Sequence, residues 1–149
     1  KEKKGHLPSD DGIDIIAVES LAFKRFADIA ILIGKTVAIV TDNDGNIKEN
    51  IIGKYKEYLE KDILHFFYET NENLKTIEPS VLACNCENGQ PTMSFKTIIS
   101  LNGSLESRDY DGILNFMKKN KAEWAFRVFD AEESIYYPKY IQDVIDFFS

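Results

Sequence analysis

Two acidic residues, Asp42 and Asp44, flank Asn43 and precede Gly45. Carboxylates one residue apart on a loop can both turn toward one point, and such oxygen ligands favour Mg²⁺ or Mn²⁺ held partly by protein and partly by a substrate phosphate. The same four residues also favour a simple turn, because Asp, Asn and Gly each suit turn geometry. The spacing excludes an EF-hand, in which the glycine does not directly follow the second acid. A divalent-metal site is one interpretation, and a plain turn is the other.

The segment before these acids, residues 36 to 41, is almost continuously apolar. A strand without alternating polarity is typical of a parallel sheet that helices cover on both faces. In such a sheet, ligands bind beyond the carboxyl ends of the strands, which is where the acids would lie. The strand therefore favours the metal site over the plain turn.

The elements around this strand follow from the spacing of apolar residues. It predicts strands at 13–18, 36–41 and 63–69, with amphipathic helices at 21–33 and about 47–59 between them. Gly34 is a stop signal for the first helix. Alternating strands and helices imply a parallel, doubly wound sheet. We expect further helices at roughly 92–101, 109–118, 120–130 and 138–148.

The fold expected from these elements is a single α/β domain over residues 1–149. It has a Rossmann-like parallel sheet flanked by helices, a polar connector at residues 1–11, and a mainly helical portion from about residue 90 to 149. At 149 residues with 44% hydrophobic content, the chain is long enough to bury one substantial core.

The net charge of −7 at pH 7 is opposite to the usual signature of a free-standing nucleic-acid binder. One basic cluster departs from this balance, and it is either a solvated helix face or a local source of positive charge. Its members are Lys118, Lys119, Lys121 and Arg127.

The two cysteines, Cys84 and Cys86, are two residues apart. A disulfide over that spacing would be strained, and the second pair of ligands that a zinc site needs is missing. No apolar run approaches the roughly 20 residues of a membrane span. We therefore expect reduced thiols in a cytoplasmic protein with no membrane partner.

Several segments, taken together and in order, resemble the Toprim nuclease domain of the OLD-family (overcoming lysogenization defect) ATP-dependent endonucleases. They are SLAFKRFADIAILIGKTVAIVTDNDG, LKTIEPSVL, KNKAEWAFRVF and YYPKYIQDVIDF. The resemblance covers most of the chain from about Gly12, and its specificity lies in the combination rather than in Asp-x-Asp. It implies a Toprim-like fold and two-metal cleavage of DNA phosphodiester bonds with Mg²⁺ or Mn²⁺, in a setting of defence against phage.

The resemblance also assigns roles to individual residues. In that family the Asp-x-Asp pair binds metal, which here falls on Asp42 and Asp44. A small hydroxyl residue followed two positions later by Glu contributes to the second metal, and Thr76 and Glu78 match that pattern. The Lys that opens a Lys-x-x-x-Ala helix stabilises charge on the phosphate, which points to Lys121.

Each of these residues also has a structural explanation. Thr76 could cap a helix, and Glu78 could be an acid at a helix start that favours the macrodipole. Lys121 could be one more exposed lysine, and Lys119 is a rival for its role. Three aromatic residues of the predicted 120–130 helix are expected in the core rather than in a base-stacking platform: Trp124, Phe126 and Phe129.

One part of the family pattern is missing. Toprim domains carry a catalytic Glu at the end of the first sheet strand, well ahead of the Asp-x-Asp pair. Glu19 follows a predicted strand, but only one helix separates it from Asp42, so we assign it to the second strand at the border of the site. We expect the first strand and its Glu to precede Lys1.

The resemblance further implies an ABC-type ATPase domain of the same protein outside these residues, with ATP bound only there and homodimerisation through it. Two other classes of protein stay open on the acids alone. One is a non-catalytic, receiver-like or interaction module that binds Mg²⁺ for regulation. The other is a glycosyltransferase with an Asp-x-Asp metal motif.

Overall fold

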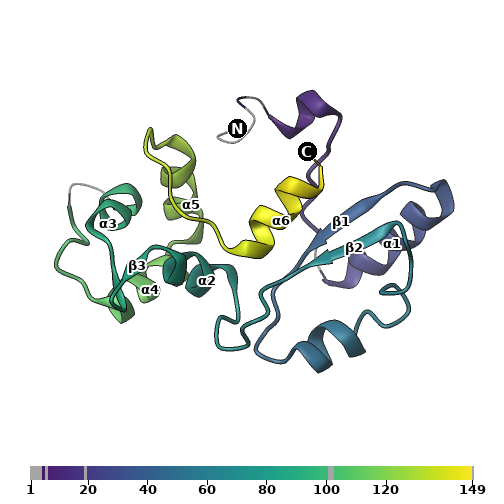
Figure 1. The fold of residues 1–149 in the computed structure, drawn as a ribbon, viewed down its shortest axis with the longest axis horizontal. Coiled ribbons are helices and arrows are strands. Elements are labelled where there is room, and N and C mark those ends of the chain that lie inside the picture. The colour runs from purple at the N-terminus through teal and green to yellow at the C-terminus, as the bar shows by residue number, and fades with distance from the viewer. Residues whose placement is uncertain (1–4, 6, 19, 101–102, 149) are drawn as a thin grey trace.

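The computed structural model describes residue 5 and residues 7–18, 20–100 and 103–148. Figure 1 shows an α/β part, containing α1, β1 and β2, beside a helical part containing α2 to α5. The helices are α1 (Ser20–Ile33), α2 (Ile77–Cys84), α3 (Met93–Ile99), α4 (Tyr110–Lys119), α5 (Lys121–Asp130) and α6 (Lys139–Phe147). The strands are β1 (Val37–Val40), β2 (Leu64–Phe67), β3 (Cys86–Glu87) and β4 (Gln90–Pro91).

The strands β1 and β2 pair in parallel, with Val37 opposite Leu64 and Val40 opposite Phe67. This confirms the parallel pairing and two of the three strands predicted for the α/β part. β3 and β4 form a separate antiparallel pair. Because β1 and β2 run in the same direction, the residues that follow both strands come out at the same edge of the sheet. Asp42 and Glu69 lie just beyond that edge.

The strand predicted at residues 13–18 is wrong. This segment is extended but forms no ladder, and its side chains Ile15 and Ile16 are 82% and 60% exposed. Its β-branched composition suits a pleated, half-buried surface, but it becomes a strand only beside a hydrogen-bonding partner. In the described sheet β1 pairs with β2 alone. Within the predicted connector, Pro8–Asp11 form a short 3-10 helix, η1.

The helix predicted at about 47–59 is present only in part. Lys48–Gly53 form a π-helix, η2, and turns follow it. The apolar spacing nevertheless identified buried positions, because Ile51, Tyr55 and Tyr58 all pack inside. The two tyrosines reach Phe23 of α1, with ring centroids 4.6 and 5.7 Å apart. Apolar spacing reports which side chains face the core, whereas the hydrogen-bond period of the backbone also depends on what they pack against.

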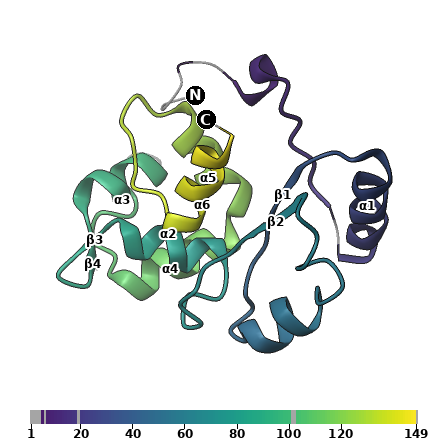
Figure 2. The same cartoon turned by 45° about the vertical axis from the view of Figure 1, so that its right-hand side comes forward.

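Helices cover both faces of the small sheet. On one face, Ala27 and Ala30 of α1 pack in a buried cluster with Tyr58 and Leu64. On the other, Phe147 of α6 contacts the rings of His65 and Phe67, with centroids 4.4 and 5.7 Å apart. Figure 2 shows α1 on one side of β1 and β2 and the helices α2 to α6 on the other. The α/β layering is therefore present, with a sheet of two strands.

The end of α1 is where its sequence predicts. Gly34 has a left-handed φ of 67°, and the N–H of Lys35 donates to the carbonyl of Ala30 at 2.9 Å. This hydrogen bond is the six-to-one bond of a Schellman cap, which a glycine at that position favours. The chain then turns directly into β1.

The helical part has its own core. Its completely buried members include Leu82, Phe95, Ile99, Ile113 and Met117. Helices α3, α4, α5 and α6 confirm the four helices predicted after residue 90 to within a few residues at each end. No helix in the described part of the chain is long and apolar enough to cross a membrane. Both cysteines are free thiols.

Two of the three aromatic residues expected in this core are not there. Trp124 is buried in it, but Phe126 and Phe129 are 67% and 71% exposed. At roughly 100° per residue, positions two and five residues beyond Trp124 lie on the opposite side of α5. The prediction that all three are core residues is therefore wrong for Phe126 and Phe129.

Candidate functional site

The loop after β1 is held by Asn43, whose side chain is completely buried. Its amide donates to the carbonyl oxygens of Glu69 and Asn71 at 2.7 and 3.2 Å, and its side-chain oxygen accepts from the N–H of Gly45 at 2.8 Å. Asn43 therefore ties the loop after β1 to the loop after β2. The acids on either side of Asn43, Asp42 and Asp44, are both exposed.

The same loop is also attached to the segment that leads into α2. The N–H of Asp44, whose φ is 51°, donates to the carbonyl of Lys75 at 3.1 Å. Gly45 has a φ of 79°, and a Cβ there would lie 2.9 Å from Cε of Lys75. The left-handed backbone and the close lysine both favour glycine at this position. These contacts bring the two acids beside the first turn of α2.

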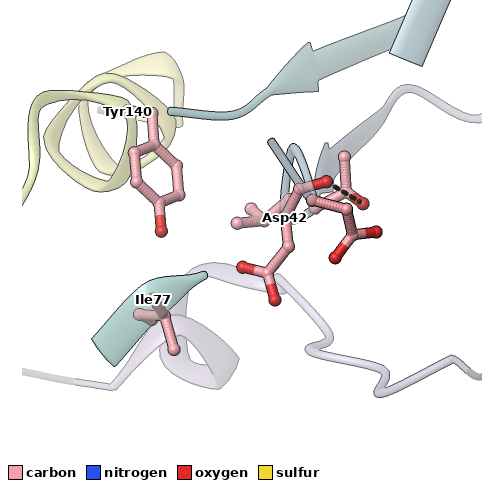
Figure 3. Close-up of a pocket in the computed structure, with 6 residues that line it drawn as sticks. Asp42, Ile77 and Tyr140 are labelled. Atoms are coloured by element: carbon pink, nitrogen blue, oxygen red, sulfur yellow. Dashed lines mark hydrogen bonds between the residues drawn. The ribbon is translucent and has the colours of Figure 1, made fainter. Parts of the chain in front are cut away.

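Asp42 lies beside Ile77, the first residue of α2. Asp42 and Asp44 line a cavity of about 410 Å³ together with Val40, Thr41, Ile77 and Tyr140. Figure 3 shows the side chains of Asp42, Ile77 and Tyr140 around this space, from three separate elements. The cavity lies beyond the carboxyl end of β1, as the parallel-sheet rule predicts.

Glu78, in the first turn of α2, is a buried carboxylate with two side-chain partners. Thr76 donates its hydroxyl to Oε2 at 2.6 Å, and Nζ of Lys121 lies 3.0 Å from Oε1. Burial acts to raise the pKa of Glu78, but the bonds from Thr76 and Lys121 outweigh it, so the pKa lies below its usual value. The hydrogen bond to Glu78 and the charge of Glu78 raise the pKa of Lys121. Both side chains are therefore charged at neutral pH.

Asp42 has the opposite shift. Partial burial at the cavity wall, followed by repulsion from Asp44 and Glu78, raises the pKa of Asp42, while Lys121 acts in the other direction. A carboxylate repelled by two others is stabilised by an added cation. The four charged side chains therefore share one electrostatic environment at the start of α2.

The residues present suit a divalent cation in their chemistry, although they form no complete cage. Among the residues that the structure describes, no three His, Cys, Asp or Glu side chains are grouped closely enough to hold a metal by themselves. Mg²⁺ commonly uses only one or two protein carboxylates, with water and substrate phosphate completing its shell. Asp42 and Asp44 supply such a pair, and the raised pKa of Asp42 marks negative charge that a cation would neutralise.

The structure separates the alternatives considered for Thr76 and Lys121. Thr76 is the residue before α2, but its side chain makes no capping hydrogen bond and donates to Glu78 instead. Within the basic cluster, Lys121 contacts Glu78, whereas Arg127 pairs with Glu123 at 3.3 Å. Glu19, assigned to the border of the site, lies outside the described residues.

Two residues near the acids were missed by the sequence reasoning. Asn43 could have been found from its place in the turn, since an Asn side chain often accepts a hydrogen bond from the backbone N–H two residues later, as Asn43 does from Gly45. Tyr140 of α6 lines the cavity and is hydrogen-bonded to Ser80 of α2. Burial and the nearby charges of Asp42 and Glu69 raise the pKa of Tyr140 to about 12. No local pattern marks Tyr140, because its place depends on how α6 packs.

Comparison of the chain with protein-family models, with curated proteins and with solved structures finds no match. Any function proposed for the chain therefore depends on its residues and their arrangement.

Proposed function

We propose that this chain is the metal-dependent nuclease domain of an OLD-like ATP-dependent endonuclease, with a Toprim-like fold, that hydrolyses DNA phosphodiester bonds. In this proposal the ATPase domain and the homodimer contacts belong to parts of the protein outside these residues. The observation that supports it is that Asp42 and Asp44 line one cavity beside α2, while Glu78 in the first turn of α2 pairs with Lys121 at 3.0 Å and both of their charges act on Asp42.

The proposed chemistry matches the types of these side chains. A bound Mg²⁺ or Mn²⁺ would supply an activated water and relieve charge on the leaving oxygen. Asp42 and Asp44 would hold the cation, with Glu78 and Thr76 contributing to the second metal position. Lys121 would stabilise charge on the phosphate as a point charge. An acidic domain can act on DNA in this way, because the cations rather than the protein surface face the phosphates.

A regulatory Mg²⁺-binding module is the second candidate from the same acids. Binding of Mg²⁺ alone requires oxygen ligands and makes no use of a cationic side chain. The interaction of Asp42 with both Glu78 and Lys121 supports the hydrolase instead, because a hydrolase uses both. A buried Glu78 on the far side of α2 would have favoured the module.

The test is DNA cleavage by the complete protein with Mg²⁺ or Mn²⁺, on supercoiled and linear substrates, with and without ATP. Asp44→Ala should abolish cleavage while the circular dichroism spectrum and thermal midpoint stay close to the wild type. Glu60→Ala is the matched control, because it removes an exposed acid before the opposite end of β2. Cleavage that persists in Asp44→Ala refutes the proposal.

A further inference from the structure

The ion pair between Lys121 and Glu78 joins an exposed side chain to a buried one. The Glu78 side chain is 2% exposed, and that of Lys121 is 68% exposed. A buried carboxylate needs a counter-charge or hydrogen bonds to remain ionised inside a protein. Glu78 obtains both, from the Lys121 ammonium on Oε1 and the Thr76 hydroxyl on Oε2.

Both oxygens of Glu78 therefore have partners before any cation arrives. The proposed function requires Glu78 to bind a cation and Lys121 to face a phosphate, and the observed ion pair satisfies neither role. Each oxygen can accept more than one bond, but a divalent cation on Oε1 would lie close to the Lys121 ammonium, 3.0 Å from the same oxygen, and the two positive charges would repel each other. Thr76 is held on the same turn, two residues away. Lys121 extends into solvent, where water can hydrate its ammonium once it is released.

We propose that Lys121 is a counter-ion which occupies the place of the cation on Glu78, and that a divalent cation displaces it toward the substrate phosphate. This inference rests on the proposed function. It gives Lys121 two successive roles, first as the counter-ion of Glu78 and then as a contact of the phosphate, and it orders the two events. The cation binds first, and Lys121 becomes available to the phosphate because a divalent cation repels the ammonium.

The inference is tested by direct binding of Mn²⁺ to the chain, measured from the electron paramagnetic resonance signal of free Mn²⁺. Lys121→Gln removes the competing charge and keeps a hydrogen-bond donor for the buried Glu78. It should bind Mn²⁺ roughly two- to fivefold more tightly than the wild type, because the loss of a partly exposed ion pair changes an equilibrium by at most about fivefold. Lys119→Gln, two residues earlier at the end of α4, is the matched control and should bind as the wild type does.

The outcomes separate this inference from the proposed function. Unchanged or weaker binding by Lys121→Gln, with clear binding by the wild type, overturns the counter-ion role and leaves the metal site standing. Equal tightening by Lys119→Gln also overturns it, because the effect would then be one of net charge. Absence of Mn²⁺ binding by the wild type overturns the metal site itself, and the inference with it.

A second measurement follows Lys121 in the wild type and uses a variant only to assign its signal. Lysines carrying ¹³C-methyl groups report their surroundings by nuclear magnetic resonance, and the signal lost in Lys121→Met identifies Lys121. Addition of Mg²⁺ should move that signal toward the position of freely exposed lysines, while the Lys119 signal stays in place. A Lys121 signal that does not move at saturating Mg²⁺ overturns the proposed displacement of Lys121 from Glu78.

Discussion

Replacing Glu78 with glutamine keeps the shape of the side chain and removes its charge. A hydrogen bond to a charged group contributes about 1 kcal/mol more than a neutral one, so the bond from Thr76, now 2.6 Å long, weakens by that amount. The ion pair with Lys121 is lost as well. Its contribution is about 1 kcal/mol, because the lysine is 68% exposed and solvent screens the pair. The expected loss of unfolding free energy is therefore about 2 kcal/mol.

This loss corresponds to a fall of roughly 4–8 °C in the thermal midpoint for a domain of this size. Urea denaturation, followed by the fluorescence of the single tryptophan, measures it directly, because Trp124 is buried and lies on the same helix as Lys121. Glu87→Gln is the control, since it neutralises an exposed glutamate and should change stability by less than about 0.5 kcal/mol.

The pH dependence of stability shows whether the charge of Glu78 stabilises the folded protein. The pKa of Glu78 is lower in the folded protein than its usual value of 4.5. The stabilisation is therefore complete above the unfolded pKa and is lost as pH falls through the folded pKa. The wild type and Glu78→Gln should differ at pH 7 and converge in acid. Equal stability at pH 7, or a more stable Glu78→Gln, refutes the reasoning, because desolvation of Glu78 would then outweigh its partners.

Three other changes test the loop after β1. The raised pKa of Asp42 means that its charge is unfavourable in the folded protein above that pKa. Asp42→Asn should therefore stabilise the chain by about 0.5 kcal/mol at pH 7, after solvent screening, and should have no such effect in acid. Urea titrations at pH 7 and in acid check this. Asn43→Ala removes a buried amide and its bonds to the carbonyls of Glu69 and Asn71, and it should cost about 2–4 kcal/mol in the same assay. Gly45 has a φ of 79°, so Gly45→Ala should lower the free energy of unfolding by about 1–2 kcal/mol and weaken Mn²⁺ binding. Wild-type stability together with wild-type Mn²⁺ affinity in this variant would show that the loop does not require glycine.

The elements that the sequence predicts correctly are those that local spacing decides. The apolar runs at β1 and β2 and the periodic segments of α1, α4 and α5 each carry their own signal. Residues 13–18 carry an equally clear strand composition, but pairing is a property of two segments, so composition alone could not decide it. Phe126 and Phe129 are a different case. Their angular positions relative to Trp124 were readable from the sequence, and counting around the helix would have placed them outside the core.

The candidate site, too, could be predicted from the sequence only in part. The order of Asp42, Asp44, Glu78 and Lys121 along the chain is local information, and the structure brings all four into one electrostatic environment. Which side chains these residues contact depends on the tertiary structure. The ion pair between Lys121 and Glu78 depends on α5 packing near the start of α2, and no spacing rule contains that contact. The nuclease role itself stays a prediction.

The position of α6 affects the order in which this molecule can assemble. Phe147 covers His65 and Phe67 on one face of the sheet, and Tyr140 supplies a wall of the cavity. Between β2 and α6 the chain passes through the whole helical part, whose core can form from contacts nearer in sequence. Contacts between distant segments form slowly, because a long loop must close first. The helical part should therefore fold early, and the acidic cavity should be completed late, when α6 returns to the sheet.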